Sequence, residues 1–238
     1  LPLIHGTDGT KLSKRHGAID INEFKKNGYL PQSIINNLIL LGWSPKKNDE
    51  IIEIKEIMKI FKLEEISKSA SIFDYVKLDH FNNHYLRKKE NYQYFVTFVK
   101  NNNIFNDFFN EDNIKIKKIF ETYKKNISYY CELEYILKIY YDKTFKTNLD
   151  NNLEINFKSI LKEFINQLNK INDWNLTNLE KCIKKFIENK KIKFSIFGKP
   201  MRLVLTNLNN GPSISDILYI LGKKNTLLRL NNYINSKT

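Results

Sequence analysis

Apolar residues recur every three to four positions along most of this chain, which is the spacing of amphipathic helices. The clearest case is segment 31–41, because Pro31 stands at a favourable first helical position and Gly42 offers an exit. The apolar residues that share one face of this predicted helix are Ile34, Ile35, Leu38 and Leu41. This segment is therefore predicted to be an amphipathic helix.

Helical spacing continues on both sides of this segment. Asp20 and Glu23 offer a capping pair for a helix over 21–27, and Gly28 offers its stop. The other segments with helical spacing are 51–61, 74–88, 89–147, 155–170, 176–189, a helix that ends at Gly222, and 225–234. Residues 1–4 are predicted to end a short strand, and residues 209–212 to form a turn. The fold class predicted by this pattern is predominantly α.

Two series of apolar residues are most prominent. In segment 51–61 the series is Ile51, Ile54, Met58 and Phe61. Between residues 89 and 147 it is Phe95, Phe98, Ile104, Phe108, Ile116, Phe120, Tyr123, Tyr130, Leu133, Leu137 and Tyr140. About four in five of these aromatic residues should lie in a core rather than stack on nucleobases, given their helical spacing and the burial tendency of Phe and Tyr. We therefore expect a cage of helices here.

The charge balance suggests a polyanionic partner. The 238 residues include 39 Lys and Arg against 26 Asp and Glu, which gives a formal net charge of +13. Lysine, asparagine, isoleucine, tyrosine and phenylalanine are abundant, and all have AT-rich codons, so part of this charge reflects base composition. The chain's arginines are scarce and therefore more informative: Arg15, Arg87, Arg202 and Arg229.

The cysteines and histidines give no sign of a metal site. Cys131 and Cys182 lie far apart and neither belongs to a CxxC, which disfavours zinc and a disulfide framework and fits a reducing cytoplasm. His80 and His84 are one helical turn apart but lack a third ligand, so exposed or RNA-facing histidines are the simpler interpretation. No apolar run approaches the ~20 residues that cross a bilayer.

A short basic loop near the start of the chain carries the strongest chemical signal. Gly9 and Gly17 bracket Lys11, Lys14 and Arg15, whose side chains suit phosphate oxygens. Composition alone favours a solvated charged face, because basic runs are common in lysine-rich chains. The order of the residues favours a polyphosphate site instead.

That order resembles the KMSKS signature of class I aminoacyl-tRNA synthetases. The segment from Asp8 to Ala18 is similar to the bacterial-type glutamyl-tRNA synthetases, where Leu12 in place of Met and Arg15 in place of Ser are usual. By this resemblance, Lys14 contacts the triphosphate of ATP, Lys11 assists, and the Ser13 hydroxyl helps to hold the loop. ATP, with Mg²⁺ in the complete enzyme, is thus the implied cofactor.

Other motifs extend the resemblance along the chain. A Ser67-Lys68-Ser69 segment precedes Phe73-Asp74, as in the family, and looks like a turn or a helix cap. The Phe81-Asn82 and Tyr85-Leu86 pairs resemble the family's Leu-Asn-x-x-Tyr-Ile. By resemblance to the terminal anticodon-binding module, Arg202, Pro212 and Ile214 contact tRNA. The competing interpretation is that Arg202 only caps a helix carbonyl.

The resemblance implies three modules in order. Residues 1–88 form a stem-contact domain with the KMSKS loop, and 89–148 and 149–238 form helical anticodon-binding modules. Residues 143–152 are the best candidate for a linker. The implied partners are tRNA(Glu), with tRNA(Gln) as a further candidate, and L-glutamate; we expect a monomer in the cytoplasm, without a membrane, and leave an organelle open.

The same resemblance implies that half of an enzyme is present. The Rossmann half with its HIGH-type histidines has no counterpart here, and there is no starting methionine. We therefore expect a fragment of a glutamate–tRNA ligase that binds tRNA but forms no glutamyl-adenylate alone, which leaves the lysine loop idle. Two alternatives remain: a non-catalytic tRNA-binding synthetase paralogue, and a generic basic helical protein that binds nucleic acid.

Overall fold

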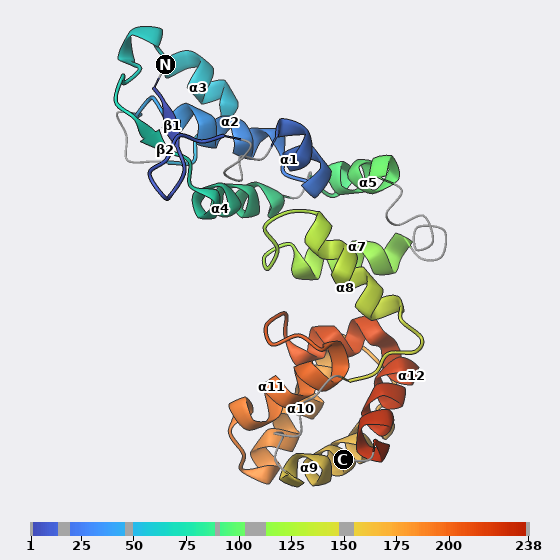
Figure 1. Cartoon of the computed structure of the whole chain (residues 1–238). Helices are drawn as coiled ribbons and strands as arrows, with labels where there is room; N and C mark the ends of the chain where they lie inside the picture. Colours follow the sequence, from blue (N-terminus) through green and yellow to red (C-terminus); the bar gives the residue numbers. More distant parts are fainter. Residues whose placement is uncertain are drawn as a thin grey trace. The chain divides into compact units, whose positions relative to one another are not determined.

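The computed structural model describes residues 2–13, 20–45, 50–88, 91–102, 113–147 and 155–236. Helices dominate these residues, as the sequence predicted, and the two named strands among them are two residues long (Figure 1). None of the helices in the described ranges is both long and apolar enough to cross a membrane. The chain folds as two compact units, Leu1–Glu111 with Lys124–Tyr135, and Asp112–Tyr123 with Ile136–Thr238. The three-module division stays a prediction.

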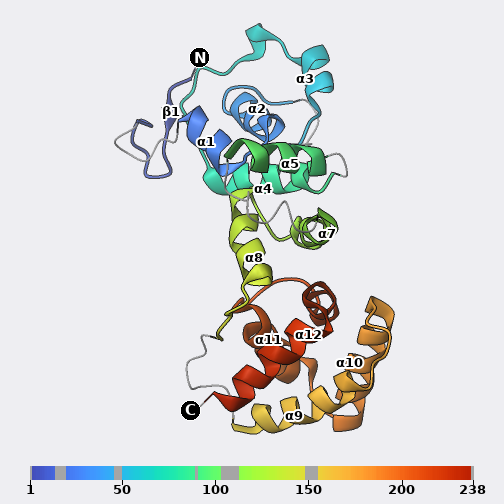
Figure 2. The same cartoon turned by 90° about the vertical axis from the view of Figure 1, so that its right-hand side faces the viewer.

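The first unit combines a small parallel sheet with short helices (Figures 1 and 2). Its elements are β1 (Ile4–His5), α1 (Ile21–Asn27), α2 (Pro31–Leu40), α3 (Ile54–Ile60), a 3₁₀ turn (Leu63–Glu65), β2 (Ser71–Ile72), α4 (Tyr75–Leu86) and α5 (Asn91–Asn102). Helix α1 begins and ends as predicted, because Asp20 accepts a hydrogen bond from the Asn22 amide and Gly28 adopts the left-handed conformation that ends the helix.

The sheet is built from segments far apart in the sequence. In the parallel pair of β1 with β2, Ile4 lies opposite Ser71 and His5 opposite Ile72. Ile4 packs against the buried cluster of Phe24, Phe73 and Leu78. Because side chains alternate across a strand, the next position carries its side chain to the other face. The sheet therefore rests on the core by one face and holds the start of the lysine loop at its end.

The fully buried side chains of helix α2 are polar, which the sequence pattern did not predict. Of the predicted apolar face, Ile34 and Leu41 pack against the cluster of Phe24, Phe73 and Leu78 and are partly buried. The buried residues of α2 are Ser33, Asn36 and Asn37, whereas Leu38 is 42% exposed. The reason is hydrogen bonding, since Asn36 accepts from the Ile52 amide at 2.8 Å and donates to the Glu50 carbonyl at 2.6 Å. The hydrogen bonds of Asn36 thus offset the cost of burying its amide group.

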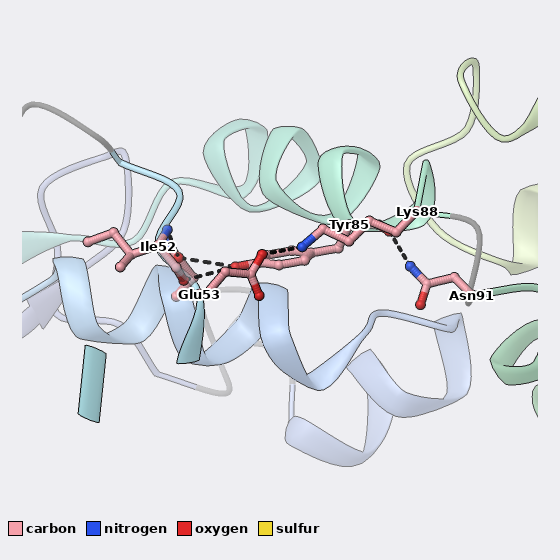
Figure 3. A network of polar contacts seen from close by, with 6 residues as sticks. Ile52, Glu53, Tyr85, Lys88 and Asn91 are labelled. Atoms are coloured by element: carbon pink, nitrogen blue, oxygen red, sulfur yellow. Dashed lines mark hydrogen bonds and ion pairs between the residues drawn. The ribbon is translucent and has the colours of Figure 1, made fainter. Parts of the chain in front are cut away.

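Tyr85 of α4 joins the hydrogen-bond network formed by Asn36 and the segment 50–52. Its hydroxyl donates to the Ile52 carbonyl at 3.1 Å, and Lys88 forms an ion pair with Glu53 (Figure 3). Burial, reinforced by the charge of Glu53, raises the pKa of Tyr85 to about 12, so this donor keeps its proton at neutral pH. The network fixes the segment before α3.

Helix α3 differs from the expected apolar pattern. Ile57 and Ile52 are buried with Trp43, while Met58 is 79% exposed. The helix spans Ile54–Ile60, and Ile57 rather than Met58 is its buried residue. Phe61, the last member of the predicted series, packs against the cluster. The series thus located the helix but misassigned Met58.

The first unit is closed by residues that follow much later in the chain. Within this unit, Ser128 contacts Asn82 and Tyr130 contacts Gly28. The Asn82 side chain donates to the Ser128 carbonyl and accepts from the Leu30 amide at 2.8 Å. A Cβ on Gly28 would lie 2.5 Å from the Tyr130 Cβ, so only glycine permits this approach.

The second unit is all helical in its described part. It contains α7 (Asn113–Tyr123), the later turns of α8 (Cys131–Tyr141), α9 (Ile155–Asn169), α10 (Leu176–Lys190), α11 (Phe194–Thr206) and α12 (Ile214–Asn235). Helix α12 is kinked at Gly222, where φ is 75°, so the expected helix end appears as a break within one long element. Phe164, Phe186 and Phe197 meet in the core with ring centroids 4.9 to 5.7 Å apart.

Candidate nucleotide and RNA sites

The lysine loop begins as a tight hairpin at the end of β1. The Leu12 amide donates to the Ile4 carbonyl and the Gly6 amide to the Thr10 carbonyl, both at 2.9 Å. Asp8 closes the turn by accepting a hydrogen bond from the Thr10 amide at 3.0 Å. These bonds hold Lys11 opposite His5 in an antiparallel bridge.

The hairpin separates an anchored side from an exposed side. Leu12 packs against the cluster of Phe24, Phe73 and Leu78, whereas Lys11 is exposed and Ser13 is half-buried. Leu12, one of the two positions that differ from the generic signature, is thus the hydrophobic anchor of the loop. Lys14 and Arg15, the rest of the predicted nucleotide site, lie outside the described residues.

The described part of the loop has the chemistry that a polyphosphate requires. An exposed ammonium group offers three donors and one positive charge. Gly9, with φ of 77°, has open space where a Cβ would stand, so the turn beside Lys11 is uncrowded. These residues can hold an anion, and the Asp8 carboxylate is engaged in closing the turn.

The Ser67-Lys68-Ser69 segment is a turn, as expected. The Ser69 amide donates to the Ser67 hydroxyl at 3.2 Å, and the Ser67 amide donates to the Gly42 carbonyl at 2.7 Å. The segment leads directly into β2. This segment therefore resembles the lysine loop in sequence but differs from it in backbone geometry.

Arg202, a predicted RNA contact, holds the turn that precedes α12. Its Nη2 donates to the Pro212 carbonyl at 3.0 Å. Its Cδ would lie 3.7 Å from a Cβ placed on Gly211. This carbonyl belongs to a turn and not to a helix, so the contact differs from the helix-capping alternative. The Arg202 Nε is buried and has no hydrogen-bond partner among the described residues.

The third predicted RNA contact, Ile214, is buried. Its side chain is 1% exposed and belongs to the core beneath the start of α12. Ser213 caps the helix by accepting a hydrogen bond from the Asp216 amide at 3.1 Å. Ser213, Ile214 and Ser215 also line a hollow of about 430 Å³ with residues of α10 and Phe194. The structure thus brings Arg202, Pro212 and Ile214 to one turn, with Ile214 on its inner side.

The two helical histidines are exposed on α4. His80 and His84 sit one turn apart, and burial together with the charge of Lys88 lowers the pKa of His84. Within the ranges that the structure describes, no group of three or more His, Cys, Asp or Glu side chains is placed to hold a metal ion. Neither histidine has a role in the sites above.

The sequence pattern did not predict a basic groove that lies between α9 and α10. The groove has a volume of about 500 Å³, and its charged lining is Glu163, Lys170, Lys181, Lys185 and Lys190. Its signal was present in the sequence, because Asn178, Lys181, Lys185 and Asn189 recur at helical spacing as a polar stripe. Lysines are so frequent in this chain that the stripe did not stand out.

Comparison with known proteins gives consistent matches along the chain. Residues 93–234 match the family described as an anticodon binding domain, and residues 1–80 match the catalytic domain of class I tRNA synthetases (E and Q). The chain is 35% identical to the glutamate–tRNA ligase of Mycoplasma mycoides subsp. mycoides, over 98% of this chain and 49% of that protein. It is 34% identical to glutamate–tRNA ligase 2 of Wolbachia pipientis subsp. Culex pipiens, over 97% and 50%.

Solved structures agree on the fold. The glutamate–tRNA synthetase of Elizabethkingia anophelis superimposes with a TM-score of 0.78 at 25% identity, covering 98% of this chain and 50% of that one. A glutamate–tRNA ligase from Elizabethkingia meningosepticum gives a TM-score of 0.79 at 24% identity, covering 99% and 51%. The chain therefore spans about half the length of the curated relatives that it matches.

Proposed function

This chain belongs to the anticodon-binding-domain family that its residues 93–234 match, and on that premise we propose that it is the tRNA-binding part of a glutamate–tRNA ligase. Such an enzyme attaches glutamate to tRNA(Glu) with ATP. The observation that carries the proposal is the order of the two family matches, class I catalytic before anticodon-binding. Relatives at 34–35% identity over nearly the whole chain support the same assignment.

The lysine loop would serve the ATP-dependent step. Lys11 and Lys14 would neutralise charge on the triphosphate, and Ser13 would hold the loop. The exposed position of Lys11 and the core anchor at Leu12 support this assignment. Oriented cations stabilise the charge that develops on departing phosphates, and Mg²⁺ bound with ATP adds to that stabilisation. The chain carries only this loop from the proposed nucleotide site, so we propose that it forms no glutamyl-adenylate by itself.

The turn held by Arg202 would serve recognition of the anticodon arm. The half-buried guanidinium of Arg202, which also donates to the Pro212 carbonyl, supports this role, because a planar guanidinium suits contacts to bases and phosphates. Pro212 would present the turn, and the buried Ile214 would shape it from within. We further propose that the protein acts as a monomer in the cytoplasm. The RNA whose binding should be compared with that of tRNA(Glu) is tRNA(Gln).

The first test is binding and turnover measured side by side. We expect the 238-residue chain to bind tRNA(Glu) more tightly than an unrelated tRNA in a filter-binding assay, and to show no ATP–pyrophosphate exchange. Equal, salt-sensitive binding of every RNA would instead indicate a generic basic protein. Exchange by this chain alone would overturn its proposed inactivity.

The second test concerns the individual residues. Arg202→Ala should weaken binding of the anticodon stem-loop about tenfold, which corresponds to ~1.4 kcal/mol. Arg87→Ala is the matched control, because Arg87 is exposed and its guanidinium donates to the Asn83 side chain one turn away on the same helix. Lys11→Ala in a full-length ligase should lower ATP–pyrophosphate exchange while leaving tRNA affinity unchanged. An unchanged exchange rate would remove Lys11 from the proposed site.

A further inference from the structure

The groove between α9 and α10 has an uneven charge distribution. Of its five charged residues, Lys190 and Glu163 form an ion pair with each other. The other three, Lys170, Lys181 and Lys185, are exposed and form no ion pair with any described residue. The groove therefore carries a local charge of about +3, which attracts anions.

The two sides of α10 carry different patterns of charge. Lys181 and Lys185 stand four residues apart, a like-charge arrangement that weakens a helix. On the opposite side, Lys184 stands between Glu180 and Glu188, each four residues away, where opposite charges support the helix. The groove side thus presents two like charges one helical turn apart, and the other side presents charges of alternating sign.

The groove is held in shape by contacts that leave its lysines exposed. Trp174, in the α9–α10 connection, donates from Nε1 to the Leu218 carbonyl at 3.0 Å. Lys223 donates to the carbonyls of Asn169 and Ile171 at 3.0 and 2.7 Å, just where α9 ends. Phe186 closes the floor against Phe164, with ring centroids 5.0 Å apart. Helices α9 and α10 both pack on α12, as Figures 1 and 2 show.

The donors of the groove suit a backbone rather than a base or a nucleotide. Side-chain ammonium groups and the amides of Gln167, Asn178 and Asn189 line it. The groove runs along the sides of two helices, where backbone N–H groups are already used within the helix, so no cradle of backbone donors surrounds a single phosphate. Scattered cationic and amide donors of this kind position phosphate and sugar groups and do not read sequence.

We propose that this groove binds the sugar–phosphate backbone of the RNA, with Lys170, Lys181 and Lys185 contacting successive phosphates. The site is separate from the turn of Arg202 and Pro212, neither of which lines the groove. The proposal rests on the proposed function for its choice of RNA, since tRNA is taken as the bound polyanion. This contact would raise the affinity for the RNA and fix its orientation, but it would not determine which anticodon is recognised.

The main test compares two double variants that lose the same charge. In Lys181→Ala/Lys185→Ala both groove lysines of α10 are removed. In the control, Lys162→Ala/Lys224→Ala, two exposed lysines of the same unit that do not line the groove are removed. Binding of a tRNA(Glu) transcript is measured by anisotropy from 50 to 300 mM salt, after far-UV circular dichroism has shown that both variants are folded.

The groove variant should bind about tenfold more weakly at the lowest salt, and its plot of log K against log salt should be shallower by about one unit for each lost phosphate contact. The control should change affinity by less than about twofold. Equal effects in the two variants would mean that only net charge matters and would overturn the proposal. A failed preference for tRNA(Glu) in the wild-type chain is a separate result, which bears on the proposed function.

Cys182 provides a second readout, because it lines the groove. Bound RNA should slow alkylation of Cys182 several-fold, and this protection should disappear in Lys181→Ala/Lys185→Ala. Cys131 lies in α8, outside the groove, and serves as the internal reference. Alkylation of Cys182 at the same rate with and without saturating RNA would overturn the proposal.

Discussion

The guanidinium group of Arg229 donates a hydrogen bond to the backbone carbonyl of Leu205 at 2.5 Å. Its second amino group donates to the Ile139 carbonyl at 2.5 Å, and its face covers the Phe145 ring at 3.9 Å from the centroid. Both carbonyls lie in the last turns of helices, where no helical partner is available. One buried arginine thus closes the ends of α8 and α11.

Replacing Arg229 should destabilise the second unit strongly. Arg229 is 4% exposed, and Arg229→Met would leave the two carbonyls without donors while retaining much of the packing volume. We expect a loss of about 2–4 kcal/mol in the free energy of unfolding, measured by urea denaturation. The exposed Arg87→Met should cost less than about 0.5 kcal/mol. Similar losses in both variants would contradict the role of the buried carbonyl contacts.

Stability should fall at high pH because of Tyr123. Burial raises the pKa of Tyr123 to about 12 from its usual 10, and its hydroxyl lies 2.8 Å from that of Tyr140. The unfolded chain therefore loses this proton first, so the stabilisation is complete below pH 10 and is lost as the pH rises toward 12. Tyr123→Phe should lose less stability than wild type over this interval, by up to ~2 kcal/mol.

That comparison requires urea denaturation at about pH 8, 10 and 11.5, with tyrosinate absorbance near 295 nm recorded in parallel. Absorbance should show one fewer late-titrating tyrosine in Tyr123→Phe than in wild type. If the two proteins lose stability in parallel above pH 10, Tyr123 does not titrate as the structure indicates.

The buried polar side chains of α2 should be essential for the stability of the first unit. Asn36→Leu makes the helix more apolar, yet it leaves the Ile52 amide and the Glu50 carbonyl without their partner. We expect a loss of about 2–3 kcal/mol in the free energy of unfolding. Leu38→Asn on the exposed side should change stability by less than about 0.5 kcal/mol. The opposite order of the two effects would show that α2 buries its apolar face instead.

Two glycines with similar backbone angles should respond differently to alanine. Gly28 and Gly9 have φ of 85° and 77°, so each substitution introduces backbone strain of about 1 kcal/mol. At Gly28 the new Cβ would also meet the backbone and Cβ of Tyr130, whereas at Gly9 nothing lies within 4 Å. Gly28→Ala should therefore cost at least ~2 kcal/mol more than Gly9→Ala in thermal or urea unfolding. Equal costs would mean that the 124–135 segment moves aside.

Local rules predicted the helices well because caps and periodicity act over a few residues. Asp20 and Gly28 delimit α1 as expected, and the turn signals at 209–212 precede α12. The turn predicted at Ser67 is confirmed for the same reason, because its hydroxyl accepts a hydrogen bond from the amide of Ser69, two positions away. The loop from Asp8 to Leu12 was likewise recognisable, since its turn is closed by its own side chain.

Which faces are buried depended on partners distant in the sequence. Asn36 is buried because Ile52 and Glu50 supply its hydrogen bonds, and no rule of helical spacing contains those partners. Arg202 was identified by its scarcity and its motif, but its bond to Pro212 and its unpaired Nε follow from how α11 and the turn pack. The basic groove arises only where α9 and α10 converge on α12.

The residues alone thus indicated a predominantly helical chain, a polyphosphate loop and the synthetase family, because these depend on local order and composition. The buried polar residues of α2, the contacts of Arg229 with two helix ends, and the grouping of the groove lysines away from described acidic partners depend on the folded chain. The physical reason is that hydrogen bonding and charge pairing in the interior join residues tens of positions apart, and each such pairing can reverse a preference that a single helix would show.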